Sequence, residues 1–367
     1  MTTLRRRVLP AVLALALLLA LPALVGDAVL IRVLTTACLF AVLAASWDLL
    51  SGFTGQVTFG HAAFVGIGGY ATALFASETT ANPALALLIG PVCAALFGLV
   101  IGIPALRLQG PYLALATLAA ASALYQLIFV FKDKTRGEDG ISGLTTLDET
   151  AVIGDIGRFI ANILGGQGFE SARPLARAAY TNYFLVVLIA GAVLLLMCWF
   201  GYGRHGVVLR SIGQEETAAQ AAGVPIARYK VAAFTISGGC AGLIGALMVL
   251  TRGSASTDLL ALDLSLIVIV MAAIGGTGSL IGPAGGAFVI ILLQDHILEL
   301  IPMVEAEPAY KQLTFALLLI LVLRFLPHGL FGSLQETILA RKRSPVESPL
   351  DSASVGDSPS EFAKEVQ

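Results

Sequence analysis

Long apolar runs without charged residues recur along the whole chain and are separated by short polar connections. A helix that crosses the hydrocarbon core of a bilayer needs about 20 predominantly apolar residues. Most of the runs approach or reach this length, so we expect an all-α integral membrane protein of about ten transmembrane helices. The expected spans are 9–26, 30–50, 61–77, 83–106, 111–131, 182–201, 231–251, 263–277, 283–301 and 309–326.

The eighth and ninth runs are the least regular, because 264–294 is one uncharged stretch. Only the glycines of 275–278 and the pair Gly282-Pro283 interrupt it. Glycine and proline weaken a helix, which predicts short, broken helices in this part of the chain. The stretch forms either two short crossings or a re-entrant pair.

The first run follows Arg5-Arg6-Arg7, an arrangement that also begins a secretory signal peptide. Its uncharged part is longer than the roughly 7–15 apolar residues of a typical signal peptide, and 23–26 make a poor cleavage site. We therefore interpret 1–26 as a retained N-terminal membrane helix. The main transmembrane domain follows at 27–332.

Composition excludes a soluble globular protein. The chain is 57% hydrophobic and 13% charged, whereas soluble domains are about 45–50% apolar and about 25% charged. A net charge of −2 gives no indication of a nucleic-acid partner. The four cysteines lie in apolar runs without a CxxC pair, and the four histidines are scattered. We expect no metal, no cofactor and no catalytic site.

Basic residues set the orientation. Every tight cluster of lysine and arginine falls on one side of the membrane if the N-terminus is inside, as the positive-inside rule requires. Both termini are then cytoplasmic, with an extracytoplasmic loop at 132–181 and a cytoplasmic loop at 203–229. Beyond about residue 333 the chain is rich in Ser, Pro, Asp and Glu, which predicts a disordered cytoplasmic tail at 333–367.

The loop 203–229 is polar yet helical in character. Gly223 followed by Pro225 is a helix stop signal. Upstream of it, apolar residues fall near helical spacing on one expected face, namely Val208, Ile212, Ala219 and Ala222. A short helix here suits the groove of a partner protein, or it rests on the membrane surface as a simple connection.

The segment TAAQAAG at 217–223, preceded by Glu216, resembles the EAA loop of bacterial ABC importer permeases. The usual acid six residues before the glycine is Thr217 here, an offset shared by LivM-type branched-chain amino acid permeases. Five more segments are similar to that family, in order: SGFTGQVTFGHAAFVGIGGY (51–70), GPYLALATLA (110–119), GEDGISGL (137–144), RYKVAAFTISGGCAGLIGAL (228–247) and GGTGSLIGPAGGA (275–287).

The resemblance implies a permease subunit in the bacterial inner membrane. It implies a heterodimer with a second permease subunit, two ATP-binding subunits and an extracytoplasmic solute-binding protein. The chain has no Gly-Lys dipeptide and hence no Walker A loop, so ATP hydrolysis is expected in the partners. The residues expected to couple this chain to the ATPases are Arg210, Glu215, Glu216, Ala218, Ala219 and Gly223.

Polar side chains inside spans are costly in hydrocarbon and tend to face a cavity or the bundle interior. The candidates for the translocation path are Gln56, His61, Tyr112, Thr117 and Gln126. For His61, a hydrogen-bonded packing role competes with contact to solute. Asp48 is expected at the membrane interface. The group Gln294, Asp295 and His296, together with Glu299, approaches the outer surface, where solvation is the simplest interpretation.

Glycines four residues apart allow helices to approach closely in a membrane. We expect this packing role for Gly98 with Gly102, Gly238 with Gly242 and Gly278 with Gly282. Other glycines, near 52–60 and 275–282, are candidates for helix breaks whose backbone lines the path.

Two alternative functions need different features. A self-contained secondary transporter requires ionisable residues near mid-membrane, and the spans hold almost none away from their ends. A permease for urea or short amides shares the quoted motifs and differs only in cargo. The sequence therefore favours a branched-chain or related amino acid importer subunit, with the urea permease as the alternative.

Overall fold

The computed structural model describes residues 2–23, 27–78, 83–105, 108, 110–150, 153–164, 174–294, 320 and 324. The expected tenth span at 309–326, the tail at 333–367, and Asp295, His296 and Glu299 lie almost wholly outside these residues. The count of ten helices therefore stays a prediction.

Apolar helices make up most of the described chain, and the all-α membrane architecture is confirmed. Within this part, five helices are long and apolar enough to cross a membrane. Helices dominate because only they, or closed barrels, satisfy every backbone polar group without water. The main helices are α1 (Thr2–Ala20), α2 (Ala28–Thr54), α3 (His61–Glu78), α4 (Pro83–Ala105), α5 (Pro111–Val130), α9 (Pro174–Tyr202), α12 (Ile226–Arg252), α13 (Leu262–Gly275) and α14 (Ile281–Leu292).

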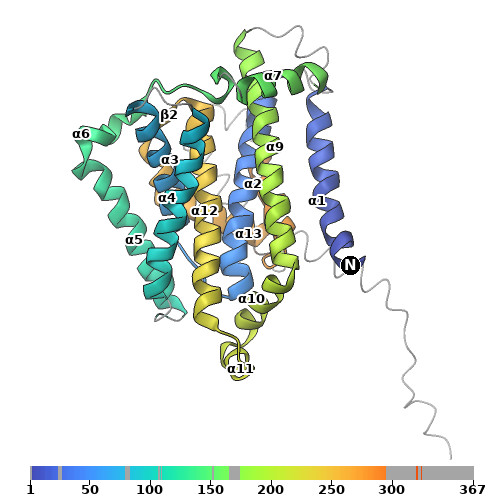
Figure 1. The fold of residues 1–367 in the computed structure, drawn as a ribbon, viewed down its shortest axis with the longest axis vertical. Coiled ribbons are helices and arrows are strands. Elements are labelled where there is room, and N and C mark those ends of the chain that lie inside the picture. Colours follow the sequence, from blue (N-terminus) through green and yellow to red (C-terminus); the bar gives the residue numbers. More distant parts are fainter. Residues whose placement is uncertain are drawn as a thin grey trace, which may run out of the picture.

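Helix α2 lies at the centre of the bundle and packs against α9, α12, α13 and α14. Helices α3 and α4 cover α12, and α1 runs along α9 (Figure 1). One end of the bundle carries α10 (Arg204–Gln214) and α11 (Glu216–Ala221), and α1 begins at the same end (Figure 1). This end is called the inner end below.

Short elements cover the opposite, outer end (Figure 1). Strands β1 (Ile141–Ser142) and β2 (Ser254–Ala255) pair antiparallel there, with Ile141 opposite Ala255. The remaining elements of this end are η1 (Leu21–Ala23), α6 (Lys132–Thr135), η2 (Gly137–Asp139), η3 (Leu147–Glu149), α7 (Ile153–Leu164) and η4 (Thr257–Leu260).

Helix α9 begins at Pro174, eight residues before the expected span at 182–201. Proline suits the first turn of a helix, because its missing N–H has no partner there. The added turns are packed rather than solvated, since Ala179 and Tyr180 are buried. Residues 174–181 of the expected loop 132–181 therefore belong to the same helix as the expected span.

Helices α13 and α14 are short, with 14 and 12 residues. At about 1.5 Å per residue each covers roughly 20 Å, less than the roughly 30 Å hydrocarbon core. They pack against each other, and a Cβ on Gly282 would overlap backbone oxygens of Gly275 and Gly276. Gly278 lies in the turn between them with φ +84°, so interpreting Gly278 and Gly282 as one helix-packing pair was wrong.

Glycines bring α4 and α12 together. A Cβ on Gly98 would lie 2.7 Å from a backbone oxygen of α12, and one on Gly102 3.2 Å from a side-chain carbon of that helix. Gly238 and Gly242 face α4 in return: a Cβ on Gly238 would lie 3.1 Å from the Ala94 oxygen, and one on Gly242 would overlap the Ala94 side chain. The backbones of α4 and α12 thus approach each other closely. Close packing of this kind stabilises helix pairs in a membrane, because lipid provides no hydrophobic force that drives helices together.

Asp48 of α2 holds the turn between α13 and α14. Its Oδ1 accepts a hydrogen bond from the amide of Gly278 at 2.6 Å, and its Oδ2 one from the amide of Leu280 at 2.9 Å. Leu280 has φ +56°, a left-handed conformation that costs roughly 1–2 kcal/mol for a residue with a Cβ. Asp48 is fully buried, so its expected place at the membrane interface was wrong.

The two residues before Asp48 tether other elements to α2. The Ser46 hydroxyl and His61 Nε2 lie 2.8 Å apart at the start of α3, and Trp47 Nε1 donates to the Thr58 carbonyl at 2.9 Å. The Ser237 hydroxyl of α12 donates to the Ser46 carbonyl at 2.6 Å. Three consecutive residues of one helix therefore fix α3, α12 and the α13–α14 turn.

We predict that Asp48→Ala lowers the thermal unfolding temperature of the protein in nanodiscs. The change leaves two buried amides without an acceptor, at roughly 1–3 kcal/mol each. The matched control is Asp27→Ala at the exposed start of α2, which removes one N-cap bond to Val29 and costs about 1 kcal/mol. Equal shifts for the two variants would contradict the role given to Asp48.

Candidate functional site

The connection between α9 and α12 folds as two helices, α10 and α11, rather than the single short helix expected within the loop 203–229. Glu215 separates them with an extended backbone, φ −154° and ψ 106°. The buried face also differs from the expected one: Leu209 and Ile212 are buried in α10 and Ala219 in α11, whereas Ala222 is exposed. The helices pack because α10 turns to meet α2 and α9.

Arg210 joins α10 to both neighbouring helices. Its guanidinium lies 4.0 Å from the ring centre of Phe53 on α2 and 5.4 Å from that of Tyr202 on α9. Such cation–π contacts contribute about 0.5–2 kcal/mol each. The Tyr202 hydroxyl in turn donates a hydrogen bond to the carbonyl of Ser279. A continuous set of contacts thus runs from α10 to the α13–α14 turn.

Close backbone contact seats α10 against the inner end of α2. A Cβ on Gly213 would overlap the carbonyl oxygen of Phe53, and one on Gly55 would lie 3.2 Å from the Gly213 oxygen. The ring of His205 at the start of α10 stacks on Phe200 at 5.4 Å. Helix α10 is therefore held against α2 and α9 along its length.

An ion pair joins α11 to α12. Lys230 Nζ lies 2.8 Å from Glu216 Oε2, and the two side chains are 3% and 40% exposed. A buried lysine without a partner is strongly unfavourable, so the pair holds α11 in one position against α12. Lys230 was missed in the sequence analysis, because its partner lies 14 residues away and no helical period relates the two.

The turn after α11 completes an exposed knob. The Gly223 amide donates to the Gln220 carbonyl and the Val224 amide to the Ala219 carbonyl, as in a glycine-terminated helix. Gly223 has φ +82°, and no atom lies within 4 Å of an added Cβ. The exposed residues of the knob are Glu215, Thr217, Ala218, Gln220, Ala221, Ala222 and Gly223.

The structure separates the five candidate path residues. His61 is fully buried beside Ser46, and Phe64 packs edge-on against its ring at 5.7 Å. Thr117 is 4% exposed, and its hydroxyl accepts from the Phe59 amide at 3.2 Å. Both side chains are therefore engaged in packing in this conformation.

The other three candidates lie nearer solvent. Gln56 lines an inner cavity of about 390 Å³ together with Glu216 and Lys230, and its Oε1 is buried without a hydrogen-bond partner among the described residues. Tyr112 is 71% exposed at the start of α5. Gln126 lines an outer cavity of about 340 Å³ between α5 and η4. The candidates thus lie at separate places in the bundle and not in a single site.

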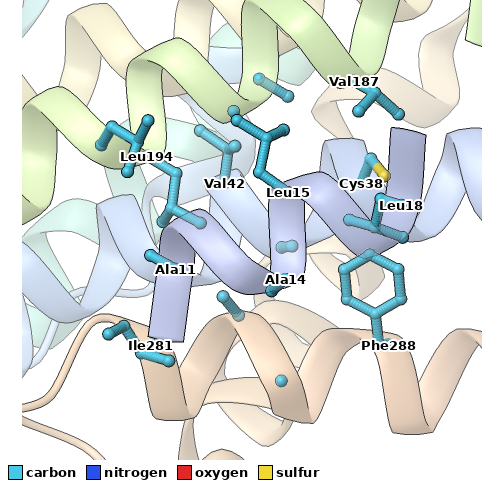
Figure 2. Close-up of a pocket in the computed structure, with 16 residues that line it drawn as sticks. Ala11, Ala14, Leu15, Leu18, Cys38, Val42, Val187, Leu194, Ile281 and Phe288 are labelled. Atoms are coloured by element: carbon cyan, nitrogen blue, oxygen red, sulfur yellow. The ribbon is translucent and has the colours of Figure 1, made fainter. Parts of the chain in front are cut away.

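A cavity of about 270 Å³ lies between α1, α2, α9 and α14, and apolar side chains point into it (Figure 2). Leu15 and Leu18 of α1, Val42 of α2 and Phe288 of α14 are among them. Because such a lining offers no hydrogen-bond partner to a charged solute, this cavity does not suit a hydrophilic path.

No group of three or more His, Cys, Asp or Glu residues suited to a metal ion occurs in the part of the chain that the structure describes. Cys38, Cys93, Cys198 and Cys240 are free thiols within the bundle. The arrangement thus contains an exposed knob, contacts that tie it to the bundle and several cavities.

Comparison with known proteins gives one family. A family model described as "Branched-chain amino acid transport system / permease component" matches residues 29–323. The chain is 26% identical over 307 residues to the high-affinity branched-chain amino acid transport system permease protein LivM of Escherichia coli (strain K12), covering 82% of this chain and 69% of that protein. It is 25% identical over 315 residues to the LivM protein of Salmonella typhimurium (strain LT2), with the same coverage. No solved structure matches the chain.

We predict that Glu216→Gln speeds hydrogen exchange of the α11 amides by about tenfold or more, equivalent to about 1.4 kcal/mol. The reason is that Lys230 then stays buried without a counter-charge. Glu215→Gln is the matched control, because the Glu215 carboxylate is exposed and accepts a bond from nearby Thr217. The double variant Glu216→Gln/Lys230→Met removes both charges and should recover protection. Equal exchange in the two single variants would rule the link out.

Proposed function

Because this chain belongs to the family of branched-chain amino acid transport system permease components, we propose that it lines one side of the path by which an ATP-driven importer moves branched-chain or related amino acids into the cytoplasm. It is a multi-pass inner-membrane permease subunit of an ABC importer and associates with ATPase and other transporter subunits. We further propose a complex of this chain, a second permease subunit, two ATP-binding subunits and an extracytoplasmic binding protein.

The observation that carries the coupling role is the knob formed by α11 and its turn. Its exposed surface faces away from the bundle, while Glu216, Arg210 and Gly213 tie it to α12, α2 and α9. A partner that moves the knob therefore moves these helices with it. The six expected coupling residues divide accordingly: Glu215, Ala218 and Gly223 face the partner, and Arg210, Glu216 and Ala219 hold the knob in place.

In the proposed cycle, ATP draws two ATPase subunits together and shifts the knob. Contacts of Arg210 and Tyr202 pass the movement to α2, α9 and the α13–α14 turn, and the pair Glu216–Lys230 passes it to α12. Alternating access then arises as packed helices rock as units. ATPases lie in the cytoplasm, so the N-terminus, at the same end as the knob, is cytoplasmic in this proposal.

A secondary transporter would need an ionisable group free to exchange a proton or ion within the membrane. Asp48 is buried in α2, but both of its oxygens accept hydrogen bonds from backbone amides of the α13–α14 turn. Its contacts support a structural role for the carboxylate.

The proposed function predicts ATP-dependent uptake of labelled leucine by proteoliposomes that hold the complete importer, with binding protein outside and ATP inside. We expect a rate about tenfold or more above that without ATP, with competition by isoleucine and valine and none by urea. Competition by urea would instead support the short-amide importer, and uptake that does not need ATP would contradict the ABC importer.

A second prediction concerns Gly223→Leu, which should lower leucine uptake about tenfold while the protein still inserts in the membrane. Leucine has room at this position, but φ +82° strains it by roughly 1–2 kcal/mol and displaces the end of α11. Gly143→Leu is the matched control, since Gly143 has φ +77° and open space at the outer end. Unchanged uptake and unchanged ATPase association in Gly223→Leu would refute the docking role.

A further inference from the structure

A cavity of about 560 Å³ opens at the outer end, remote from the knob. Its walls are the first turns of α2 and α9, the last turn of α12 and the short helix η3. The volume falls within the range of about 300–1,000 Å³ that is typical of small-molecule sites. The cavity is thus large enough for an amino acid.

Charged groups of both signs face this cavity. Arg32 comes from α2 and Arg252 from α12, whereas Asp148 and Glu149 come from η3. Neither arginine forms an ion pair with any residue that the structure describes. An unpaired guanidinium presents a rigid fork of donors that matches a carboxylate.

The acidic side of the cavity includes a buried acceptor without a donor. Asn182 of α9 is 9% exposed, and its Nδ2 donates to Asp148 Oδ1 at 3.0 Å. This bond turns the amide oxygen away from Asp148, and Asn182 Oδ1 has no hydrogen-bond partner among the described residues. The bond from Nδ2 holds the Asp148 carboxylate at the wall of the cavity.

Apolar surface lies beside the charges. Leu39 of α2 is 4% exposed and lines the same cavity, with Ala178 and Ala179 of α9 near it. Leu39 lies about two helical turns further from the outer end than Arg32. An aliphatic side chain therefore has a place to pack below the charged rim.

We propose that this outer cavity binds a zwitterionic α-amino acid with an aliphatic side chain, which rests on and deepens the proposed function. Arg32 and Arg252 bind the carboxylate, Asp148 binds the ammonium, and the side chain packs toward Leu39. The site explains cargo class as well: urea carries no charge, so it forms hydrogen bonds but no ion pair with the two arginines and the acid.

Other cavities suit such a ligand less well. The cavity of Figure 2 is apolar. In the inner cavity that Gln56 lines, Lys230 is already paired with Glu216. The outer cavity alone, among those in the described chain that are discussed above, combines unpaired cations with acidic acceptors.

The first test measures binding directly. The assembled importer in nanodiscs, without binding protein, is examined by saturation-transfer NMR with leucine, leucinamide, 4-methylpentanoate and urea. We expect a signal for leucine, and signals about tenfold weaker for the two analogues that lack one charge and for urea. The variants Asp148→Asn and Arg32→Gln/Arg252→Gln should lose the leucine signal. Their matched controls, Asp133→Asn and Lys134→Gln, change exposed outer residues outside the cavity and should keep it.

The second test uses the uptake assay with binding protein, so that failure of the site and failure of the proposed function differ. If the wild type imports leucine but its NMR signal is absent or equal in all variants, the outer site is wrong and the proposed function stands. If the wild type imports no amino acid, the proposed function fails. If the cavity variants keep leucine binding but lose stimulation of ATP hydrolysis by loaded binding protein, the cavity is a protein-docking surface and the proposal is overturned.

Discussion

The membrane allows a helix to break only where other groups of the protein pair with the freed backbone, because the hydrocarbon core offers no water. Helices α3 and α14 both start at the level of Ser46–Asp48 of α2, about 9–12 Å before the inner end of that helix at roughly 1.5 Å per residue. Just before α14, the carboxylate of Asp48 accepts hydrogen bonds from the freed amides of Gly278 and Leu280. At α3 hydroxyls do so, since Thr117 accepts from Phe59 and Ser265 from the Ala62 amide at 2.8 Å. The broken helices depend on these acceptors.

Pairing within the bundle also determines what can move. Tyr202 and Asp48 bind the same turn from two helices, and Arg210 lies over the rings of Tyr202 and Phe53. The turn is therefore clamped between α2 and α9, next to α10. A shift of α10 acts on a packed group of helices rather than on a loose loop. Packed groups of this kind tend to switch between discrete arrangements instead of deforming gradually.

The sequence predicted those features that depend on local pattern. Apolar runs located the spans of α2 to α5 and α12 to within a few residues, because hydrocarbon length is a strong constraint. Family motifs indicated the loop that forms the knob. Asp48 was misjudged because its partners lie 230 and 232 residues away, and no periodicity reports such a pairing. The break at Glu215 was missed for the same reason, because it depends on distant contacts: α10 packs against α2 and α9, whereas α11 is joined to α12. The path candidates were chosen because they are polar residues within expected spans. This criterion does not separate a side chain that packs in the interior, such as His61, from one that is exposed, such as Gln126.

The two ends of the molecule are linked by the same three helices. At the inner end, Phe53 and Tyr202 connect α2 and α9 to α10, and Lys230 connects α12 to α11. At the outer end, Arg32, Asn182 and Arg252 of these helices face the outer cavity. Each pair of contacts is about 30 Å apart along its helix. A tilt of α12 relative to α9 by roughly 10° over that length displaces its far end by roughly 5 Å, which is enough to separate Arg252 from Asp148, held on α9 by Asn182, and to weaken a ligand bound between them. A site that binds only in one arrangement of α2, α9 and α12 is what an importer needs in order to release its cargo.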